Sequence, residues 1–424
     1  MADDGSPAPG SGLRAVFALP GYRRLWAART ISQWGDVAAS VALALLVFQL
    51  TGSGLGVSAV VAAEILPVLL LAPLAGLVAD QLPRRTVMIA ADMTRAMLAG
   101  VLPMVADDVG AVYAIAAGMS AASVFFSPAA GAVLPDLVHR DQLVAANSGI
   151  WTTAVLSQIA LAPVTGLLIS VTSPTVPFWV DAGSYIISAA LLVGLPQCAR
   201  SAGSAPAPSA ARGWRDRWIE AAAGIRHIRA DQRLIALAVG QVLAALSAGA
   251  TSALLVVYVR DHLHAPPAGY GIAIGAIGVG AALGPLVLIR FIRDTARPGW
   301  VFGPYALRGG VDLVLAASSN LPAAAAALSV YGLGTSTGAV TFNSMLQATI
   351  PDALRGRVMA AFDLTWQTGR LVSLAVGAVL ADRIGISAVY VSGGILLLLA
   401  AALGPLIWVG NQGREGTGQG RSKG

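Results

Sequence analysis

Residues 76–96 read GLVADQLPRRTVMIAADMTRA and interrupt an apolar part of the chain with a short run of charges. Before the run, residues 55–79 carry a single charge, at Glu64, and after it the next charge is at Asp107. The charges of the run itself belong to Asp80, Arg84, Arg85, Asp92 and Arg95. Their spacing predicts a short polar loop between two apolar helices, with the last two charges inside the second helix.

The composition of the whole chain fits a protein that crosses a membrane many times. Of its 424 residues, 56% are hydrophobic and only 11% are charged, whereas about a quarter of a typical soluble domain is charged. The formal net charge is +6, but the basic residues lie in short runs between apolar segments. This distribution indicates membrane topology and not binding of nucleic acid. We therefore expect an all-α polytopic membrane protein that lies in a lipid bilayer.

The chain contains twelve apolar segments that are long enough to span a bilayer as helices, which takes about 20 residues. They are 25–50, 55–79, 86–106, 110–134, 143–171, 175–195, 232–259, 267–290, 299–319, 322–347, 363–384 and 386–409. The polar stretch between the sixth and seventh segments divides them into six and six. The predicted parts are an N-terminal cytoplasmic segment (1–22), a six-helix bundle (23–195), a cytoplasmic linker (196–231), a second six-helix bundle (232–409) and a disordered cytoplasmic tail (410–424).

The linker carries its own pattern. Trp214, Trp218, Ala221 and Ile225 recur at three to four residues. Such spacing predicts either an amphipathic helix on the inner leaflet of the membrane or a solvated connecting helix.

The distribution of basic residues sets the orientation. With the N-terminus inside, 21 Lys and Arg residues fall on the inner side, whereas only Arg260 and Arg383 fall on the outer side. Basic residues are enriched in cytoplasmic loops, so both termini are expected in the cytoplasm. The start of the chain is acidic and has no apolar core typical of a signal peptide. The expected location is therefore the inner (plasma) membrane.

The two halves resemble each other weakly. ALLVFQL (44–50) matches ALLVVYV (253–259), APL (72–74) matches GPL (284–286), and LPD (134–136) matches IPD (350–352). The offsets of 209, 212 and 216 keep the same order along the chain. They indicate a duplicated six-helix unit, and repeats of the same orientation would place a substrate cavity at their interface near the membrane midplane.

The charged loop resembles the signature between the second and third spans of major facilitator transporters, G-x-x-x-D-R/K-x-G-R/K-R/K. The matching positions are Gly76, Asp80, Arg84 and Arg85. Gln81 stands where the signature has a basic residue, and Pro83 where it has glycine.

Further stretches look like the drug:proton antiporter-3 branch of that superfamily, which includes macrolide-efflux and enterobactin-exporter relatives. They are RRLWAARTISQWGD (23–36), TGSGLG (51–56), FFSPAAGAVLPDLV (125–138), EAAAGIRHIRADQRL (220–234) and IPDALRGRVMA (350–360). The resemblance implies the major facilitator fold, with twelve transmembrane helices in two pseudo-symmetric six-helix bundles. It also implies a secondary active transporter, not an enzyme, that exports a drug, siderophore or secondary metabolite by alternating access in exchange for protons. We expect a monomer that acts on a small-molecule substrate.

In that family the acid of the loop meets the start of the eleventh helix, which is expected here near Asp363. The resemblance implies that Asp80, Arg84 and Arg85 form a gating contact that holds one conformation, because a carboxylate is stabilised by the partial positive charge of a helix N-terminus. The alternative is a loop whose arginines only set the topology.

Charged residues inside apolar segments are costly, at about 2.5–3.5 kcal/mol each on insertion scales. Asp92 and Arg95 are three residues apart, and Arg308 and Asp312 are four apart, so each pair lies on one helical face. Both are expected to form buried ion pairs.

Asp36 differs because no basic residue lies three or four positions from it. Gln33 adds polarity to the same face one turn earlier. A carboxylate in a partly dry cavity can bind and release protons, which makes Asp36 the first candidate for proton coupling or substrate contact. The alternative is a permanent hydrogen bond to a neighbouring helix. Glu64 is the second candidate, and Arg370 is the candidate partner of either acid.

Ala162, Pro163 and Gly166 in the fifth segment resemble the antiporter motif built around Gly-Pro-x-x-Gly, with alanine in place of the first glycine. Proline removes a helical hydrogen bond and allows a bend, so this helix is expected either to rock during transport or to carry a simple packing kink.

Other functions find little support. Gly334-x-Ser336-x-Gly338 has the spacing of a hydrolase motif but falls within an apolar helix, where the two glycines serve packing. The chain has no Walker loop and no cluster of metal ligands, so neither a metal nor another cofactor is expected. A facilitator or importer of a small nutrient remains an alternative. A membrane enzyme or a receptor that does not transport is a further one, although no catalytic constellation supports it.

Overall fold

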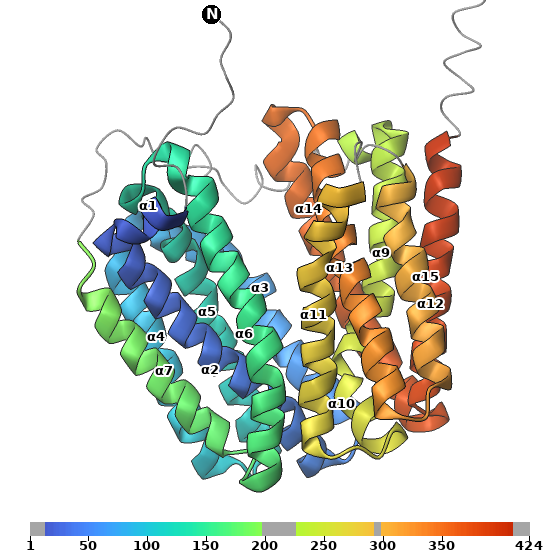
Figure 1. The fold of residues 1–424 in the computed structure, drawn as a ribbon, viewed down its shortest axis with the longest axis horizontal. Helices are drawn as coiled ribbons and strands as arrows, with labels where there is room; N and C mark the ends of the chain where they lie inside the picture. Colours follow the sequence, from blue (N-terminus) through green and yellow to red (C-terminus); the bar gives the residue numbers. More distant parts are fainter. Residues whose placement is uncertain (1–12, 197–225, 292–297, 410–424) are drawn as a thin grey trace, which may run out of the picture. The chain divides into compact units, whose positions relative to one another are not determined.

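The computed structural model describes residues 13–196, 226–291 and 298–409; within these ranges a few side chains, that of Asp80 among them, are not described. The described part is almost entirely helical (Figure 1). The elements before the linker are α1 (Leu13–Ala18), α2 (Pro20–Thr51), α3 (Gly54–Gln81), α4 (Arg84–Val101), η1 (Leu102–Val105), α5 (Val109–Leu137), η2 (Arg140–Gln142), α6 (Leu143–Val171) and α7 (Val176–Val193).

The second half repeats this pattern of long helices. Its elements are α9 (Gln232–Ala253), α10 (Leu255–Val257), η3 (Tyr258–His262), α11 (Pro267–Phe291), α12 (Pro298–Ala317), α13 (Leu321–Thr349), α14 (Asp352–Ile384) and α15 (Ile386–Val409). The predicted amphipathic pattern of the linker and the predicted disordered tail lie outside the described residues.

Each predicted apolar segment contains one long helix, and most boundaries agree within a few residues. The third segment also includes η1, and the seventh continues from α9 through α10 into η3. By length and composition alone, nine helices of the described part are long and apolar enough to cross a membrane. α12, α13 and α14 are not among these nine. The chain is thus an all-helical, polytopic membrane protein, while the number of twelve spans stays a prediction.

The expected start of the eleventh helix near Asp363 is wrong. α14 begins at Asp352, directly after Pro351, and Asp363 lies in its interior as an exposed residue. The apolar pattern sets in only at residue 363, but a helix is built by backbone hydrogen bonds and includes the polar turns before it. Proline is well suited to a helix start, because it has no N–H to leave unpaired there.

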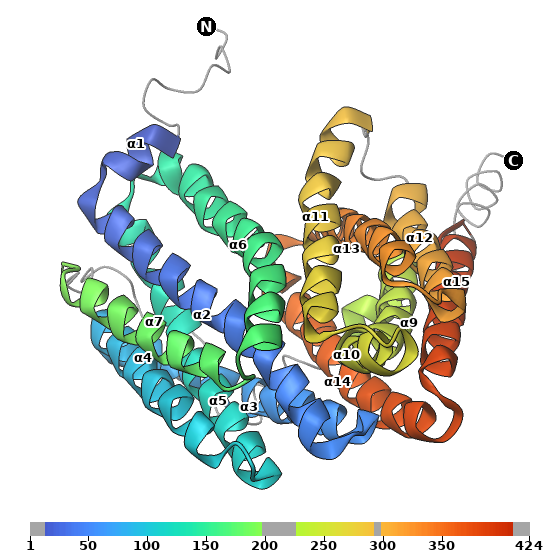
Figure 2. The ribbon, with the colours of Figure 1, turned by 60° about the horizontal axis from the view of Figure 1, so that its bottom comes forward.

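The helices of the two halves pack in the same order. In the first half α5 packs on α4, α4 on α7, α7 on α2, and α2 on α6 (Figure 2). In the second half α13 packs on α12, α12 on α15, α15 on α9, and α9 on α14. These helices hold equivalent places in the two six-helix sets, so the weak sequence repeat corresponds to a duplicated architecture.

The chain separates into two compact units. Among the described residues, one contains 13–51 and 63–196, and the other contains 52–62, 226–291 and 298–409. The first turns of α3 therefore belong with the C-terminal helices. There Asp382 of α14 accepts hydrogen bonds from the backbone N–H groups of Gly54 at 2.8 Å and Leu55 at 3.3 Å. N–H groups at a helix start have no partner within the helix, so this carboxylate caps α3.

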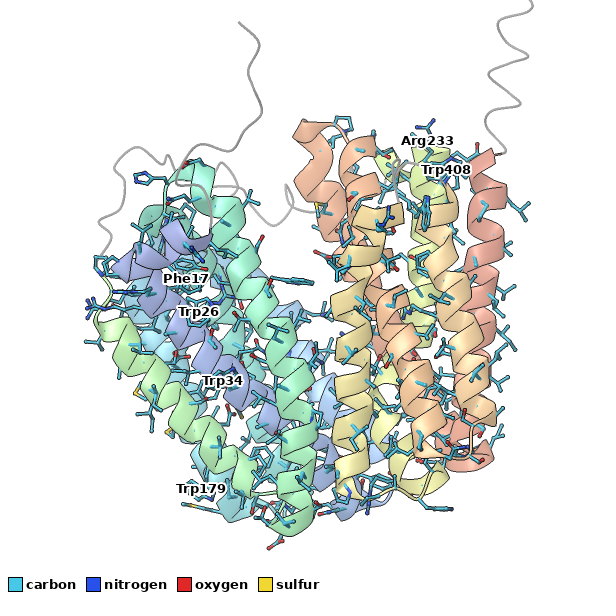
Figure 3. All side chains as sticks on the ribbon, in the orientation of Figure 1. Phe17, Trp26, Trp34, Trp179, Arg233 and Trp408 are labelled. Carbon is cyan, nitrogen blue, oxygen red and sulfur yellow. The ribbon has the colours of Figure 1, made fainter. Side chains whose placement is uncertain are left out.

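Small residues and aromatic rings account for much of the packing. α11 and α13 approach so closely that a Cβ on Gly280 would lie 1.7 Å from the carbonyl oxygen of Ser329, the kind of approach that small residues allow in membranes. At one end of the second unit, the Arg233 guanidinium lies 5.6 Å from the centre of the Trp408 ring (Figure 3). In the first unit, the indole of Trp34 donates to the Ser157 hydroxyl at 2.9 Å.

Candidate functional site

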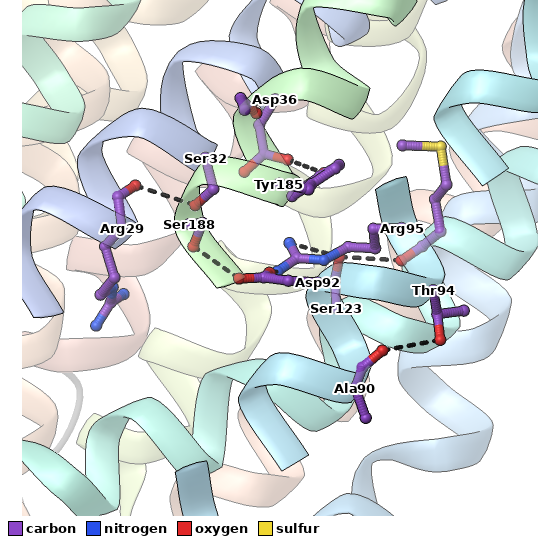
Figure 4. A network of polar contacts seen from close by, with 12 residues as sticks. Arg29, Ser32, Asp36, Ala90, Asp92, Thr94, Arg95, Ser123, Tyr185 and Ser188 are labelled. Atoms are coloured by element: carbon purple, nitrogen blue, oxygen red, sulfur yellow. Dashed lines mark hydrogen bonds and ion pairs between the residues drawn. The ribbon is translucent and has the colours of Figure 1, made fainter. Parts of the chain in front are cut away.

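A group of polar and charged side chains lies inside the first unit, between α2, α4, α5 and α7 (Figure 4). We call it the N-terminal polar cluster; its members are Asp36, Asp92, Arg95, Ser123, Asp181, Tyr185 and Ser188. Asp92, Asp181 and Ser188 are fully buried, and Arg95 is 4% exposed. Buried charges need partners, so the contacts of each member indicate its role.

Arg95 and Asp92 form an ion pair on α4, in which Nη2 of Arg95 donates to Oδ1 of Asp92. The second carboxylate oxygen, Oδ2, accepts a hydrogen bond of 2.6 Å from Ser188 on α7. Arg95 also donates through Nη1 to Ser123 on α5 at 3.4 Å. Both oxygens of Asp92 are therefore occupied, and this pair links α4 to α5 and α7.

Two aromatic rings enclose the guanidinium of Arg95. Its central carbon lies 4.8 Å from the centre of the Phe126 ring and 4.3 Å from that of Tyr185. A planar guanidinium interacts favourably with ring faces. Arg95 is thus held from several sides, which fits a fixed positive charge at the centre of the cluster.

Asp36, half-buried on α2, has a partner that is distant in sequence. The hydroxyl of Tyr185 on α7 donates a hydrogen bond to Oδ1 of Asp36, and the two residues are 149 positions apart in the chain (Figure 4). Arg95 lies within electrostatic range of this carboxylate. A bond to a neighbouring helix was one of the two alternatives for Asp36, and its presence leaves a coupling role open.

The other sequence candidates lie in varied places. Gln33 is half-buried on α2, one turn before Asp36. Glu64 is half-buried on α3, and its backbone carbonyl accepts a hydrogen bond of 2.6 Å from Ser120. Arg370 belongs to the second unit and donates to Gln367 at 3.2 Å. Its pairing with an acid of the first unit stays a prediction.

The expected ion pair between Arg308 and Asp312 is not formed. Arg308 donates instead to the hydroxyl of Tyr331 at 2.8 Å, with its guanidinium carbon 4.7 Å from the centre of that ring. Asp312 accepts from Ser247 at 3.5 Å. A tyrosine on the adjacent helix α13 competes for the guanidinium, which spacing within one helix does not reveal. α12 holds in the second half the place of α4 in the first, and the offset from Arg95 to Arg308 falls within the range that relates the two halves.

The arginines of the charged loop are bound within the first unit. Arg84 pairs with Asp136 at 2.8 Å, and Arg85 donates to the backbone carbonyl of Leu195 at 3.0 Å. The side chain of Asp80 lies outside the described residues, so the gating contact stays a prediction.

The proline motif lies within a continuous helix. α6 runs from Leu143 to Val171 through Pro163, with Ala162 and Gly166 buried. α6 packs on α2, the helix of Asp36. Whether it rocks during transport stays a prediction.

Sequence reasoning missed Ser123, Tyr185 and Ser188 as members of the cluster, and although it marks Asp181 as an acid inside an apolar segment, it does not place this residue beside Asp36. One signal was available: Asp181, like Asp36, has no basic residue three or four positions away. Among the described residues, no three His, Cys, Asp or Glu side chains are placed to hold a metal ion.

Comparison with known proteins identifies a matching protein family. A model of the family described as "transmembrane secretion effector" matches residues 12–414. The multidrug efflux pump Tap of Mycolicibacterium fortuitum is 28% identical, over 85% of this chain and 88% of its own. Macrolide efflux protein A of Streptococcus pyogenes is 24% identical, over 91% of this chain and 95% of its own. An uncharacterised transporter of the major facilitator type from Bacillus subtilis is 26% identical, over 89% of this chain and 91% of its own.

Solved structures agree on the fold. A crystal structure of the nucleoside transporter NupG aligns with a TM-score of 0.70 and 15% identity, over 91% of this chain and 98% of that one. A bacterial homologue of the iron transporter ferroportin, in an inward-facing state, aligns with a TM-score of 0.69 and 16% identity, over 91% of this chain and 98% of that one. Such identities show a common fold alone.

Proposed function

Because this chain belongs to the transmembrane secretion effector family of the major facilitator superfamily, we propose that it is a proton-driven exporter of a drug, siderophore or secondary metabolite. Membership makes it a membrane transporter of a small molecule and not an enzyme. The observation that carries the proposal is the Asp36 carboxylate, which is half-buried in α2, held by Tyr185 and close to the charge of Arg95.

The names of two relatives support export. Tap is named a multidrug efflux pump, and the streptococcal relative a macrolide efflux protein. Each covers more than four fifths of this chain, so the likeness is not limited to one segment. Export of an organic compound is therefore the direction that we propose.

Proton exchange requires a group that is protonated in one half-cycle and free in the other. Asp36 suits this role better than Asp92, because both oxygens of Asp92 are already bonded by Arg95 and Ser188. A carboxyl group accepts a hydrogen bond whether or not it is protonated. Tyr185 can thus hold Asp36 in place through both states, while the charge of the site changes.

The charge of Asp36 then sets the substrate preference of each state. The deprotonated carboxylate attracts a cationic or strongly polar group, and protonation removes that attraction. A proton that binds Asp36 from the outer side would favour release of the substrate there. Its later loss to the cytoplasm would prepare the site for the next substrate. This order of events exchanges one proton for one substrate at a single carboxyl group.

The direct test is transport by purified protein in proteoliposomes. With an acidic lumen and an alkaline exterior, ethidium or radiolabelled erythromycin should accumulate in the lumen against its own gradient. A protonophore should abolish this accumulation, because no other energy source is present. If the probes only equilibrate across the membrane, at a rate that does not depend on the pH gradient, the protein is a facilitator and the proposal is wrong.

We further propose that both termini and the segment 196–231 are cytoplasmic, in the inner (plasma) membrane, because nearly all basic residues outside the predicted apolar segments fall on that side. A cysteine at position 205, on a Cys198→Ser background, should resist an impermeant maleimide in intact cells and react after permeabilisation. A cysteine at position 261, in a predicted outer loop, is the matched control and should react in intact cells. Labelling of position 205 in intact cells would show that this segment lies outside, and the proposed topology would then be wrong.

A further inference from the structure

Asp181 on α7 is a buried acid that none of the roles above uses. Its side chain is fully buried, and neither carboxylate oxygen has a hydrogen-bond partner among the described residues. Ser184, one turn later, lies nearby but donates its single proton to the backbone carbonyl of Asp181 at 2.8 Å. A buried carboxylate without donors is costly when ionised. The environment of Asp181 therefore favours the neutral, protonated acid.

The place of Asp181 connects it to Asp36. α2 and α7 approach so closely that a Cβ on Gly35 would lie 2.3 Å from Oδ1 of Asp181 and 2.2 Å from Oγ of Ser184. Only glycine fits at position 35. The Asp181 carboxyl thus faces the backbone of α2 at the residue next to Asp36, and the two acids lie within electrostatic range of each other.

The charges around Asp181 do not balance. The titratable groups that face it are Asp36 on α2, Asp92 and Arg95 on α4, and Tyr185 on α7 itself. α6 and η1 also touch α7, but neither has a titratable side chain. The ion pair of Asp92 and Arg95 neutralises itself. Asp36 and Asp181 remain as two neighbouring acids without a positive charge of their own.

We propose that Asp181 is a second proton-binding group, which forms with Asp36 an acidic pair that takes up and releases protons during transport. This inference rests on the proposed proton-driven export and extends it from one carboxyl group to two. Each uptake converts one carboxylate and one proton from water into a carboxylic acid, and each release reverses it. With both acids protonated the N-terminal polar cluster is neutral, and each proton released leaves one net negative charge. The deprotonated pair would therefore favour a cationic substrate.

The first test needs no substrate, because its probe is the proton. Infrared difference spectra of the purified full-length chain, recorded between acidic and alkaline pH, report carboxylic acids that lose their protons. Asp181→Asn should remove one titrating carboxyl signal from the spectrum of the wild type. Asp36→Asn should remove another, and the double variant both. Ser184→Ala is the matched control, since it alters the same turn of α7 but keeps the acid, and it should retain the wild-type signals.

Two results would overturn the inference. One is an Asp181→Asn spectrum that superimposes on that of the wild type, which would make Asp181 a permanently protonated structural residue. The other is the loss of the same signals in Ser184→Ala, which would make the effect one of packing. Asp181→Glu distinguishes loss of the titrating acid from a folding defect in Asp181→Asn, because it keeps a titratable group at this position and should recover a titrating signal.

Transport separates this inference from the proposed function. If a pH gradient drives export equally well in the wild type and in Asp181→Asn, the proposed role of Asp181 is wrong and the proposed function stands. If the wild type shows no proton-driven export although the spectra assign a titrating proton to Asp181, the proposed function fails while the acidic pair is retained as a proton-binding site. Loss of gradient-driven export in Asp181→Asn, together with loss of its signal, supports both.

Discussion

The Asp36→Asn variant is expected to exchange substrate downhill at the wild-type rate but to lose uphill export driven by a pH gradient. Asparagine has nearly the same shape and keeps an oxygen that can accept the hydrogen bond from Tyr185. The contact between α2 and α7 should therefore survive, and with it the conformational cycle. What asparagine cannot do is bind and release a proton. Uphill accumulation of ethidium in proteoliposomes with an acidic lumen should fall to background, whereas exchange without a gradient should persist.

Tyr185→Phe is the matched control for this experiment. Phenylalanine removes the hydrogen bond to Asp36 but keeps the acid and the ring that lies against Arg95. If Asp36 serves only to join α2 to α7, Asp36→Asn keeps the hydrogen bond and should export like the wild type, whereas Tyr185→Phe loses that bond and should be impaired. If Asp36 carries the proton, Tyr185→Phe keeps gradient-driven export. Wild-type export by Asp36→Asn would contradict the coupling role, and Glu64 would be the next acid to test.

The fold was predictable from the sequence because its main determinant is local. A membrane-spanning helix is recognisable as a long apolar run, and most predicted segments agree with the helices within a few residues. The prediction failed at α14, where polar residues from 352 onward are part of the helix. Nor did the pattern show that Gly52–Ala62 belongs with the C-terminal helices. That depends on contacts of a kind seen between Gly54 and Asp382, which are 328 positions apart.

The candidate site was predictable only where its contacts are local. Asp92 and Arg95 are one turn apart, and the structure brings them together. The same rule misled at Arg308, because a tyrosine on another helix lies closer to its guanidinium than the acid one turn away. Helical spacing states which side chains can meet on one helix. It says nothing about competitors from the neighbouring helices.

Asp36 and Asp181 show what single-sequence reasoning can and cannot find. Both lack a nearby base in sequence, which marks them as acids without a local explanation. Their proximity depends on the close approach of α2 and α7 at Gly35, a feature of packing. The sequence could nominate each acid separately, but only the structure joins them in one cluster.

Removal of the positive charge at the centre of this cluster should have the largest effect on stability. Arg95→Met leaves Asp92 buried with only Ser188 as a partner, and it leaves three acids without a base. Breaking a buried ion pair by loss of one partner typically costs about 3–5 kcal/mol. We expect a decrease of that order in the free energy of unfolding, measured by titration with SDS in mixed micelles. Methionine retains an apolar stem of similar length, so a cavity should contribute little.

The exposed ion pair of the same unit gives the matched control. Arg84 and Asp136 are joined at 2.8 Å, but their side chains are 36% and 31% exposed. Pairs that reach water contribute about 0–1 kcal/mol, so Arg84→Met should change the free energy of unfolding far less than Arg95→Met. The double variant Asp92→Asn with Arg95→Met should recover much of the loss, because neither charge is then left unpaired. Equal losses at positions 84 and 95 would mean that the cluster is open to water and its arginine well screened. A double variant no more stable than Arg95→Met would instead show that Arg95 stabilises the unit through Phe126 and Tyr185, and not through its ion pair with Asp92.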